Sequence, residues 1–389
     1  MDDAELRSLV PRVLGVLVRR GADFATAEDA VQEALVRALT TWDDDPPDSP
    51  AAWLTTVAWR AFLDLTRSDA ARRDREARVD AEPPAGEVPS ADDTLHLYFL
   101  CAHPALTPSS AVALTLRAVG GLTTRQIADA YLVPEATMAQ RISRAKLTVA
   151  RDGVGGGGPG AGAPGDVGTV MRVLYLVFNE GYSGDVDLAA EAIRLTRQLA
   201  ALVDDPEVQG LLALMLLHHA RRASRTGADG RLVPLAEQDR AVWDTGLIAE
   251  GVAVLQAALA RDRLGEYQAQ AAIAALHADA RSVGETDWVQ IVEWYDELLA
   301  IADTPIVRLN RVVAVGEADG APAGLAALAT VPDGVPRREA VAAHLHERNG
   351  DLALAARLYA DAARLAPNQA ERDHQTRQAA RVNESLRRR

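Results

Sequence analysis

The chain has 389 residues, which is too long for one hydrophobic core and predicts two or three domains. Hydrophobic residues make up 48% of the chain and aromatic residues only 4%, and the prominence of alanine, leucine and arginine favours an all-α fold. A formal net charge of −14 disfavours unaided binding to nucleic acid, and the single cysteine excludes an internal disulfide. No signal-peptide pattern and no bilayer-length apolar run is present, so we expect a cytoplasmic protein.

The N-terminal domain is predicted to span residues 1–78. Amphipathic patterns indicate helices near residues 3–20 and 26–42, and Thr26 and Asp29 suit the N-cap and the first turn of the second helix. After "DDDPPDSP", the stretch "AAWLTTVAWRAFLDLTRSDAARR" predicts a third helix.

The third helix carries aromatic and basic residues close together. Trp53 and Trp59 lie six positions apart, Arg60 follows directly, and Arg67 lies two turns further on. This pattern is typical of surfaces that bind unpaired bases, because a ring can stack on a base while a guanidinium neutralises the backbone. The alternative is that both tryptophans belong to the core of a small helical bundle.

Two stretches divide the chain. The stretch "VDAEPPAGEVPSADD" at residues 79–93 has three prolines, five carboxylates and no basic residue, so residues 79–91 are predicted to form an acidic linker. Residues 152–168, "DGVGGGGPGAGAPGDVG", form a Gly/Pro-rich linker that predicts a flexible coil. The linkers leave two further blocks, 92–151 and 169–389.

A helix-turn-helix is predicted at residues 123–146, "TTRQIADAYLVPEATMAQRISRAK", after helices near 92–102 and 108–119. Its second helix is predicted to begin at Pro134, because proline fits the first position of a helix but not its interior. A helix presented in this way can enter the major groove of DNA. The alternative is an ordinary amphipathic hairpin in a helical protein.

The second helix of this motif has an apolar face and a polar face. Met138, Ile142 and Ala145 form an apolar stripe that can pack with Ile127 and Leu132. The opposite face is expected to expose groups that contact base edges or phosphates: Glu135, Thr137, Gln140, Arg141 and Arg144.

The last block, residues 169–389, is predicted to be a repeat-like helical domain. Residues 345–373 fit a tetratricopeptide unit, with Tyr359 on the core face and Pro367 at the end, and residues 288–315 match more weakly. Stacked helix pairs of this kind offer a concave surface to a protein or peptide partner.

The stretch "LYLVFNEGYS" at residues 174–183 permits two interpretations. Asn179, Glu180 and Tyr182 offer hydrogen-bonding groups beside a glycine, as expected of a regulatory joint between domains. Alternatively, the stretch is a helix C-terminus with a glycine stop.

No residues form a convincing catalytic or metal-binding pattern. His218 and His219 are adjacent, so they point about 100° apart on a helix, and "CAH" at 101–103 offers one thiol and one imidazole. We therefore expect no cofactor, no metal and no enzymatic activity. An enzyme with an active site near residues 174–219 remains an alternative.

The order of these elements resembles a known family. "AEDAVQEALVRAL" and "PAAWLTTVAWRAFLDLTR", then a tether and "GGLTTRQIADAYLVPEATMAQRISRAK", are similar to bacterial RNA polymerase sigma factors of the extracytoplasmic-function type. The subgroup with a long C-terminal helical-repeat extension also has a stretch like "LYLVFNEGYS" after its second sigma domain. The resemblance covers nearly the whole chain, and the order of elements is more specific than any one motif.

The resemblance implies roles for individual residues and implies the β′ and β subunits of core polymerase, together with promoter DNA, as partners. The segment around Asp29, Gln32 and Glu33 would dock on the clamp helices of β′ in core polymerase. Residues implied at the −10 element are Trp53, Thr56, Trp59, Arg60 and Arg67. Residues implied at the −35 element are Arg125, Glu135, Thr137, Gln140, Arg141, Arg144 and Lys146. "VAWR" stands where many relatives have an alanine, a basic residue and an asparagine, which leaves the separate roles of Trp59 and Arg60 open.

The resemblance also gives the acidic charge a physical explanation. Residues 117–151 carry six basic and two acidic residues, so a basic module lies within an acidic chain. A sigma factor binds promoters when core polymerase supplies most of the electrostatic attraction, and an acidic surface suppresses stray binding. The alternative is a stand-alone helix-turn-helix regulator with a helical domain that senses a ligand or partner.

Overall fold

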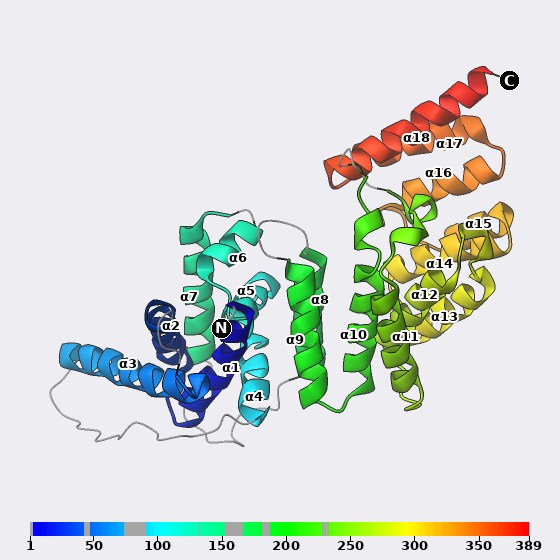
Figure 1. Ribbon diagram of the computed structural model, residues 1–389. Helices are drawn as coiled ribbons and strands as arrows, with labels where there is room; N and C mark the ends of the chain where they lie inside the picture. Colours follow the sequence, from blue (N-terminus) through cyan, green and yellow to red (C-terminus); the bar gives the residue numbers. More distant parts are fainter. Residues whose placement is uncertain are drawn as a thin grey trace. The chain divides into compact units, whose positions relative to one another are not determined.

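The computed structural model describes residues 3–42, 47–73, 91–131, 133–151, 166–180, 187–227, 231 and 233–388. Within these ranges the secondary-structure elements are helices, so the all-α prediction is confirmed (Figure 1). The helices form two compact units, Met1–Asp204 and Asp205–Arg389. In the described part of the chain, no helix is both long enough and apolar enough to cross a membrane.

The first three helices pack on one another and form the beginning of the first unit. They are α1 (Asp3–Arg19), α2 (Phe24–Thr41) and α3 (Pro50–Arg73). The N-cap of α2 is Asp23, whose side chain accepts a hydrogen bond from the Thr26 backbone N–H at 3.0 Å. The prediction that Thr26 and Asp29 begin this helix is therefore wrong, because Asp23 already satisfies an N–H of the first turn.

Four helices build the next part of the first unit: α4 (Ala91–Cys101), α5 (Pro108–Ala118), α6 (Thr124–Ala130) and α7 (Glu135–Arg151). A capping box begins α6, since the Thr123 hydroxyl accepts from the Gln126 backbone and the Gln126 side chain accepts from the Thr123 backbone. The Pro134 carbonyl accepts from the N–H groups of Thr137 and Met138 at the start of α7. Local sequence thus fixes both helices of the predicted motif.

Two further helices complete the first unit, although the sequence groups them with the C-terminal block. These are α8 (Val167–Glu180) and α9 (Leu188–Leu202), which pack on α4 and α5. The buried Tyr98 hydroxyl donates a hydrogen bond to the Leu195 carbonyl at 2.9 Å. The division between compact units therefore falls after Asp204 rather than at the Gly/Pro-rich stretch. Residues 79–90 and 152–165 of the two predicted linkers lie outside the described residues.

The second unit is a succession of helices in which each packs on the next one or two. Its α-helices are α10 (Pro206–His219), α11 (Thr245–Leu259), α12 (Glu266–Asp279), α13 (Trp288–Ile301), α14 (Pro305–Ala318), α15 (Ala321–Leu328), α16 (Arg338–Arg348), α17 (Leu352–Leu365) and α18 (Gln369–Arg387). Its short 3₁₀ helices are η1 (Arg222–Ser224), η2 (Leu235–Glu237), η3 (Arg240–Val242) and η4 (Val283–Glu285).

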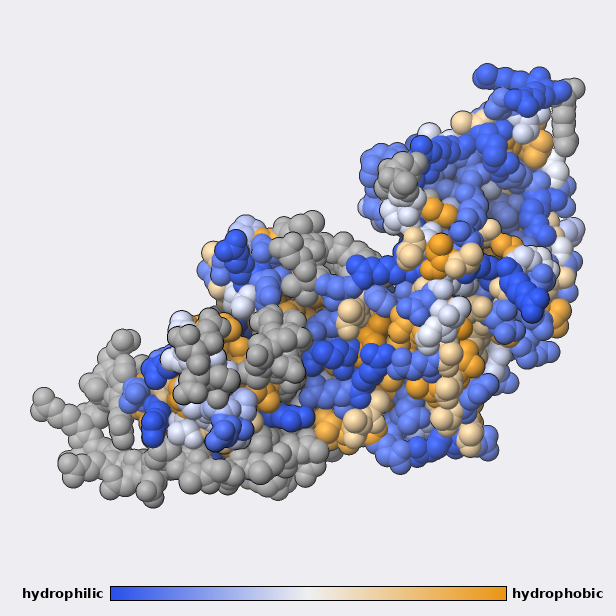
Figure 2. Space-filling model, viewed as in Figure 1, coloured by the Kyte–Doolittle hydropathy of each residue, from blue (hydrophilic) through white to orange (hydrophobic). Residues whose placement is uncertain are grey.

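The last helices of the second unit have the pairing that the repeat pattern predicts. Residues 288–315 span α13 and most of α14, which pack together, and α17 packs on both α16 and α18. Tyr359 is buried in a cluster with Ala343, Ala355 and Val382, as expected for the core face. In the view of Figure 2, hydrophilic residues cover the surface of the terminal helix α18.

Candidate nucleic-acid interface

Helix α7 has the two faces predicted from its sequence. Met138, Ile142 and Ala145 are buried against α5 and α6, and Ile127 of α6 is fully buried. Leu132, expected in the same contact, lies outside the described residues. The opposite face exposes Glu135, Thr137, Gln140 and Arg144, with Arg141 half-buried. A row of polar side chains along a helix anchored by its other face is the geometry that major-groove recognition requires.

Arg125 lies outside α7, on the preceding helix α6. Its side chain is exposed and lies 3.9 Å from the Asp129 carboxylate, one helical turn away. An exposed pair at this distance contributes little to stability, so the guanidinium can leave Asp129 for a phosphate at small cost.

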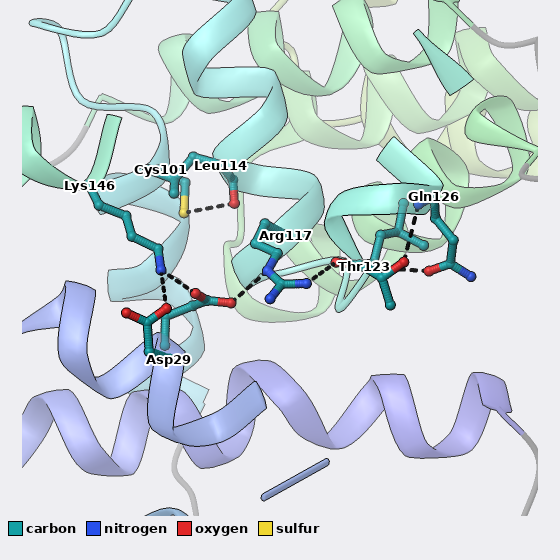
Figure 3. Close-up of polar contacts among 9 residues, drawn as sticks. Asp29, Cys101, Leu114, Arg117, Thr123, Gln126 and Lys146 are labelled. Atoms are coloured by element: carbon teal, nitrogen blue, oxygen red, sulfur yellow. Dashed lines mark hydrogen bonds and ion pairs between the residues drawn. The ribbon is translucent and has the colours of Figure 1, made fainter. Parts of the chain in front are cut away.

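Lys146 has a different environment from the rest of the predicted DNA-binding set. It is buried at 8% exposure, and its Nζ lies 2.5 Å from Glu28 Oε2 and 2.7 Å from Asp29 Oδ1. Figure 3 shows Lys146 and Arg117 pointing toward the same part of α2, beside Asp29. The resemblance implies that Lys146 contacts DNA, but in the structure its ammonium group is bound by two carboxylates of α2, the helix that the resemblance places on core polymerase.

Glu28 is the centre of this ion-pair network. Its carboxylate is fully buried and also forms an ion pair with Arg117 of α5, with 2.8 Å between Glu28 Oε1 and Arg117 Nε. Arg117 Nη1 donates in turn to the Leu122 carbonyl at 3.1 Å, in the turn that precedes α6. A buried carboxylate is tolerated when cations and hydrogen bonds compensate its lost hydration, and here two cations do so. The network joins α2, α5 and α7.

The predicted polymerase-binding residues lie along one side of α2. Asp29 keeps 63% of its side chain exposed despite the contact with Lys146, Gln32 is half-buried, and Glu33 is exposed and paired with Arg37. Two large apolar side chains, Val36 and Leu39, are 62% and 59% exposed on the following turns. A charged patch beside exposed apolar residues is the composition of a protein-docking surface.

The predicted −10 residues on α3 divide into buried and accessible groups. Trp59 is only 6% exposed and packs beside Phe62, with the Arg20 guanidinium 5.6 Å from its ring centroid. Trp53 is half-buried in an edge-to-face contact with Trp42 at 5.1 Å.

The remaining members of this set include a threonine and two arginines. Thr56 is half-buried and donates its hydroxyl to the Ala52 carbonyl, and Arg60 is exposed. Arg67 lies within α3, but its side chain is outside the described residues. Among the side chains of α3 that the structure describes, Arg60 is therefore an accessible cation, whereas Trp59 has the packing of a core residue.

The predicted regulatory joint lies mostly outside the described residues. Asn179 is exposed near the end of α8, which finishes at Glu180. Neither the side chain of Glu180 nor Tyr182 is among the residues that the structure describes.

Four residues were not identified as site residues from the sequence: Glu28 and Arg117 of the buried ion-pair network, and Val36 and Leu39 on the exposed side of α2. A signal for Glu28 exists, because it shares one helical face with the buried Phe24, Val31 and Leu35. An acidic residue on such a stripe needs a buried cation, but the sequence does not reveal which cation lies opposite. Among the described residues, no group of three His, Cys, Asp or Glu side chains is arranged to hold a metal ion.

The anchored helix-turn-helix, with its exposed polar face, defines this chain as a DNA-binding transcription protein of helical class. Residues 6–73 match the family "Sigma-70 region 2" and residues 96–149 match "Sigma-70, region 4". Residues 166–259 match a family of unknown function, which begins at α8 and ends with α11. The two sigma matches, in this order and followed by further helices, support an extracytoplasmic-function RNA polymerase sigma factor with a C-terminal extension.

Two known proteins are similar to the chain. An uncharacterized protein of Rhizobium meliloti (strain 1021) is 42% identical over 351 residues, covering 83% of this chain and 81% of the relative. The ECF RNA polymerase sigma factor SigJ of Mycobacterium tuberculosis (strain ATCC 25618 / H37Rv) is 29% identical over 291 residues, covering 63% of this chain and 91% of the relative. No solved structure matches the chain. Sigma factor families are not enzymes, and their role implies interaction with RNA polymerase core and promoter DNA.

Proposed function

We propose that the chain directs core polymerase to promoters by using three separate surfaces. The exposed face of α7, with Gln140 and Arg144, contacts the −35 element, and Arg60 on α3 contacts the −10 element. Asp29 and its neighbours on α2 dock on the β′ subunit. The observation that carries this proposal is the polar face of α7, opposite an apolar stripe that is buried against α5 and α6.

The ion-pair network supports a coupling between polymerase docking and DNA binding. Lys146 spans Glu28 and Asp29, so one cation touches both the docking helix and the recognition helix. Docking of α2 on a basic surface of β′ would compete with Lys146 for the exposed Asp29 carboxylate. Glu28 and Arg117 remain paired in that event, which preserves the buried part of the network.

In vitro transcription with core polymerase tests the role of α7. Gln140→Ala and Arg144→Ala should each reduce transcription from a cognate promoter by about 5- to 100-fold, since a bidentate base contact is worth about 1–3 kcal/mol. Arg372→Ala, at an exposed arginine of α18, is the matched control and should retain full activity. Equal activity of all three variants would refute the assignment of α7 to the −35 element.

The C-terminal extension is proposed to modulate this activity through a protein or peptide partner. The compact units indicate where to divide the chain, because a cut after Asp204 keeps α8 and α9 with the unit on which they pack. Transcription by residues 1–204 should differ at least threefold from that by the full chain at equal core occupancy. Identical rates across promoters and salt concentrations would exclude a modulating role.

A further inference from the structure

The second unit contains a cluster of arginine and histidine side chains that the role in transcription does not use. His218 lies in the last turn of α10, three residues before Arg221, Arg240 lies in η3, and His277 lies in the last turn of α12. The guanidiniums of Arg221 and Arg240 lie 5.8 Å and 4.8 Å from the ring centroid of the same tryptophan, Trp243. The two guanidiniums therefore bring their positive charges to one place, on the same aromatic ring.

The scaffold of this cluster is fixed by hydrogen bonds. Trp243 is buried, and its indole N–H donates to the Ser224 hydroxyl at 2.8 Å. Arg240 Nη1 donates to the carbonyls of His277 and Ala280 at 2.5 and 2.6 Å, which caps the C-terminal end of α12. Arg240 thus has a structural role that accounts for its position.

Arg221 has no comparable role. Apart from its contact with Trp243, neither a carboxylate nor a hydrogen-bond acceptor faces its guanidinium among the residues that the structure describes. Burial, with Arg225 and Arg240 nearby, lowers the pKa of Arg221 to about 10. A guanidinium carries five N–H donors, and leaving them unsatisfied beside like charges is unfavourable.

The two histidines have a similarly one-sided environment. Burial, followed by the charges of Arg221 and Arg225, lowers the pKa of His218 to about 3. Burial, followed by Arg221 and Arg240, lowers the pKa of His277 to about 4, and its ring packs edge-to-face on Trp288 at 5.2 Å.

Nearby carboxylates do not neutralise the cluster. The charge of Glu285 interacts with Arg240. The charge of Asp244 interacts with His219, and its side chain also caps the N-terminus of α11. Neither carboxylate acts on Arg221. Two guanidiniums meet at this place, so the donor set is suited to an anion.

We infer that Arg221, His218 and His277, braced by Arg240 and Trp243, form a binding site for a small ligand that carries a phosphate group. The guanidinium fork of Arg221 matches the geometry of phosphate oxygens, a dianion compensates the neighbouring guanidiniums at once, and a neutral imidazole can donate one N–H to it. All of these residues except His277 lie within the span matched by the family of unknown function. The site goes beyond the proposed promoter-binding role and gives the extension a small-molecule ligand.

Thermal unfolding of the full chain with inorganic phosphate tests this site, at pH 7.5 and matched ionic strength in chloride. Saturating phosphate should raise the unfolding midpoint of the wild type by about 5 °C, since a ligand that binds only the folded state stabilises it. Acetate should not do so. Arg221→Met should abolish the phosphate effect, while Arg222→Met, at the exposed neighbouring arginine, should retain it.

The unfolding midpoint in chloride alone separates a ligand site from a purely structural role. Arg221→Met should unfold at the wild-type temperature or above, because it removes a buried charge that lies among like charges. A lower midpoint in every buffer would assign Arg221 to structure and overturn the proposal. Equal phosphate stabilisation of both variants, stabilisation by acetate alone, or no saturable phosphate effect on the wild type would each overturn it as well.

Discussion

Lys146 Nζ lies 2.5 Å from Glu28 Oε2, so the proposed DNA-recognition helix is tied to the proposed polymerase-docking helix by a buried ion pair. The Glu28 carboxylate also forms an ion pair with Arg117. It therefore has two cationic partners, Lys146 and Arg117, and both are buried or nearly buried. Region 2 and region 4 are therefore linked in the first unit by charge as well as by apolar packing.

Glu28→Gln should destabilise the first unit by about 3–5 kcal/mol, because it leaves Lys146 and Arg117 with poorly compensated buried charges. Glu33→Gln is the matched control, since the Glu33–Arg37 pair is exposed and contributes about 0.5 kcal/mol or less. Urea unfolding followed by circular dichroism measures both. Equal losses in the two variants would mean that the buried network does not stabilise the fold.

The exposed apolar residues of α2 provide a second prediction. Val36→Ala combined with Leu39→Ala should weaken binding to core polymerase by about 2 kcal/mol, roughly 30-fold, because docking removes both side chains from water. Thermal stability should be unchanged. Ile306→Ala, at an exposed isoleucine of α14, should leave binding intact in a fluorescence-anisotropy titration. If all variants bind core polymerase alike, another surface carries the docking.

Trp59 and Arg60 are neighbours in sequence but should respond differently to substitution. Trp59→Ala should cost about 3–5 kcal/mol of folding stability, because the ring is buried beside Phe62. Arg60→Ala should change stability by about 0.5 kcal/mol at most and should reduce promoter opening, measured by permanganate footprinting of the holoenzyme. A stable Trp59→Ala variant with defective opening would instead place that ring on the DNA.

The stability of the second unit should fall in acid because of its buried histidines. The pKa of His218 is lowered to about 3 and that of His277 to about 4, whereas an unfolded imidazole titrates near 6.5. The unfolded state therefore takes up protons first as pH falls from about 6.5 toward 4. Each histidine can remove up to about 1.4 kcal/mol per pH unit over that window.

Urea unfolding from pH 7.5 to 4.5 in phosphate-free buffer measures this dependence. His218→Gln should make the loss of stability with acid less steep, because the substituted side chain does not titrate. His103→Gln, in the first unit, should leave the slope for the second unit unchanged. The same slope in wild type and His218→Gln would show that this imidazole stays accessible to protons when folded.

Local patterns in the sequence predicted the elements of the DNA-binding module. Pro134, predicted to begin the second helix, lies one residue before the start of α7 at Glu135, and the spacing of Met138, Ile142 and Ala145 identifies the buried face. The capping box of Thr123 and Gln126 is a further local signal, recognised only in the structure. These signals depend on neighbours within a few residues, so one sequence suffices to find them.

Long-range contacts could not be predicted in this way. Lys146 is a basic residue on the recognition helix α7, which by itself suggests a DNA contact. Its side chain is nevertheless taken up by ion pairs with Glu28 and Asp29, which lie on a helix far away in the sequence. The assignment of α8 and α9 to the first unit depends likewise on contacts such as that between Tyr98 and Leu195. A glycine-rich stretch predicts where the chain can bend. It does not predict whether the helices that follow it pack on the domain before it or on the domain after it.

The central claim is that these modules recognise a promoter only together with core polymerase, and a gel-shift titration of promoter DNA tests it most directly. The account predicts no specific shift with the purified full chain at physiological salt, and a specific shift when core polymerase is added, lost in Arg144→Ala. Tight, sequence-specific binding by the chain alone, unchanged by core polymerase, would contradict it.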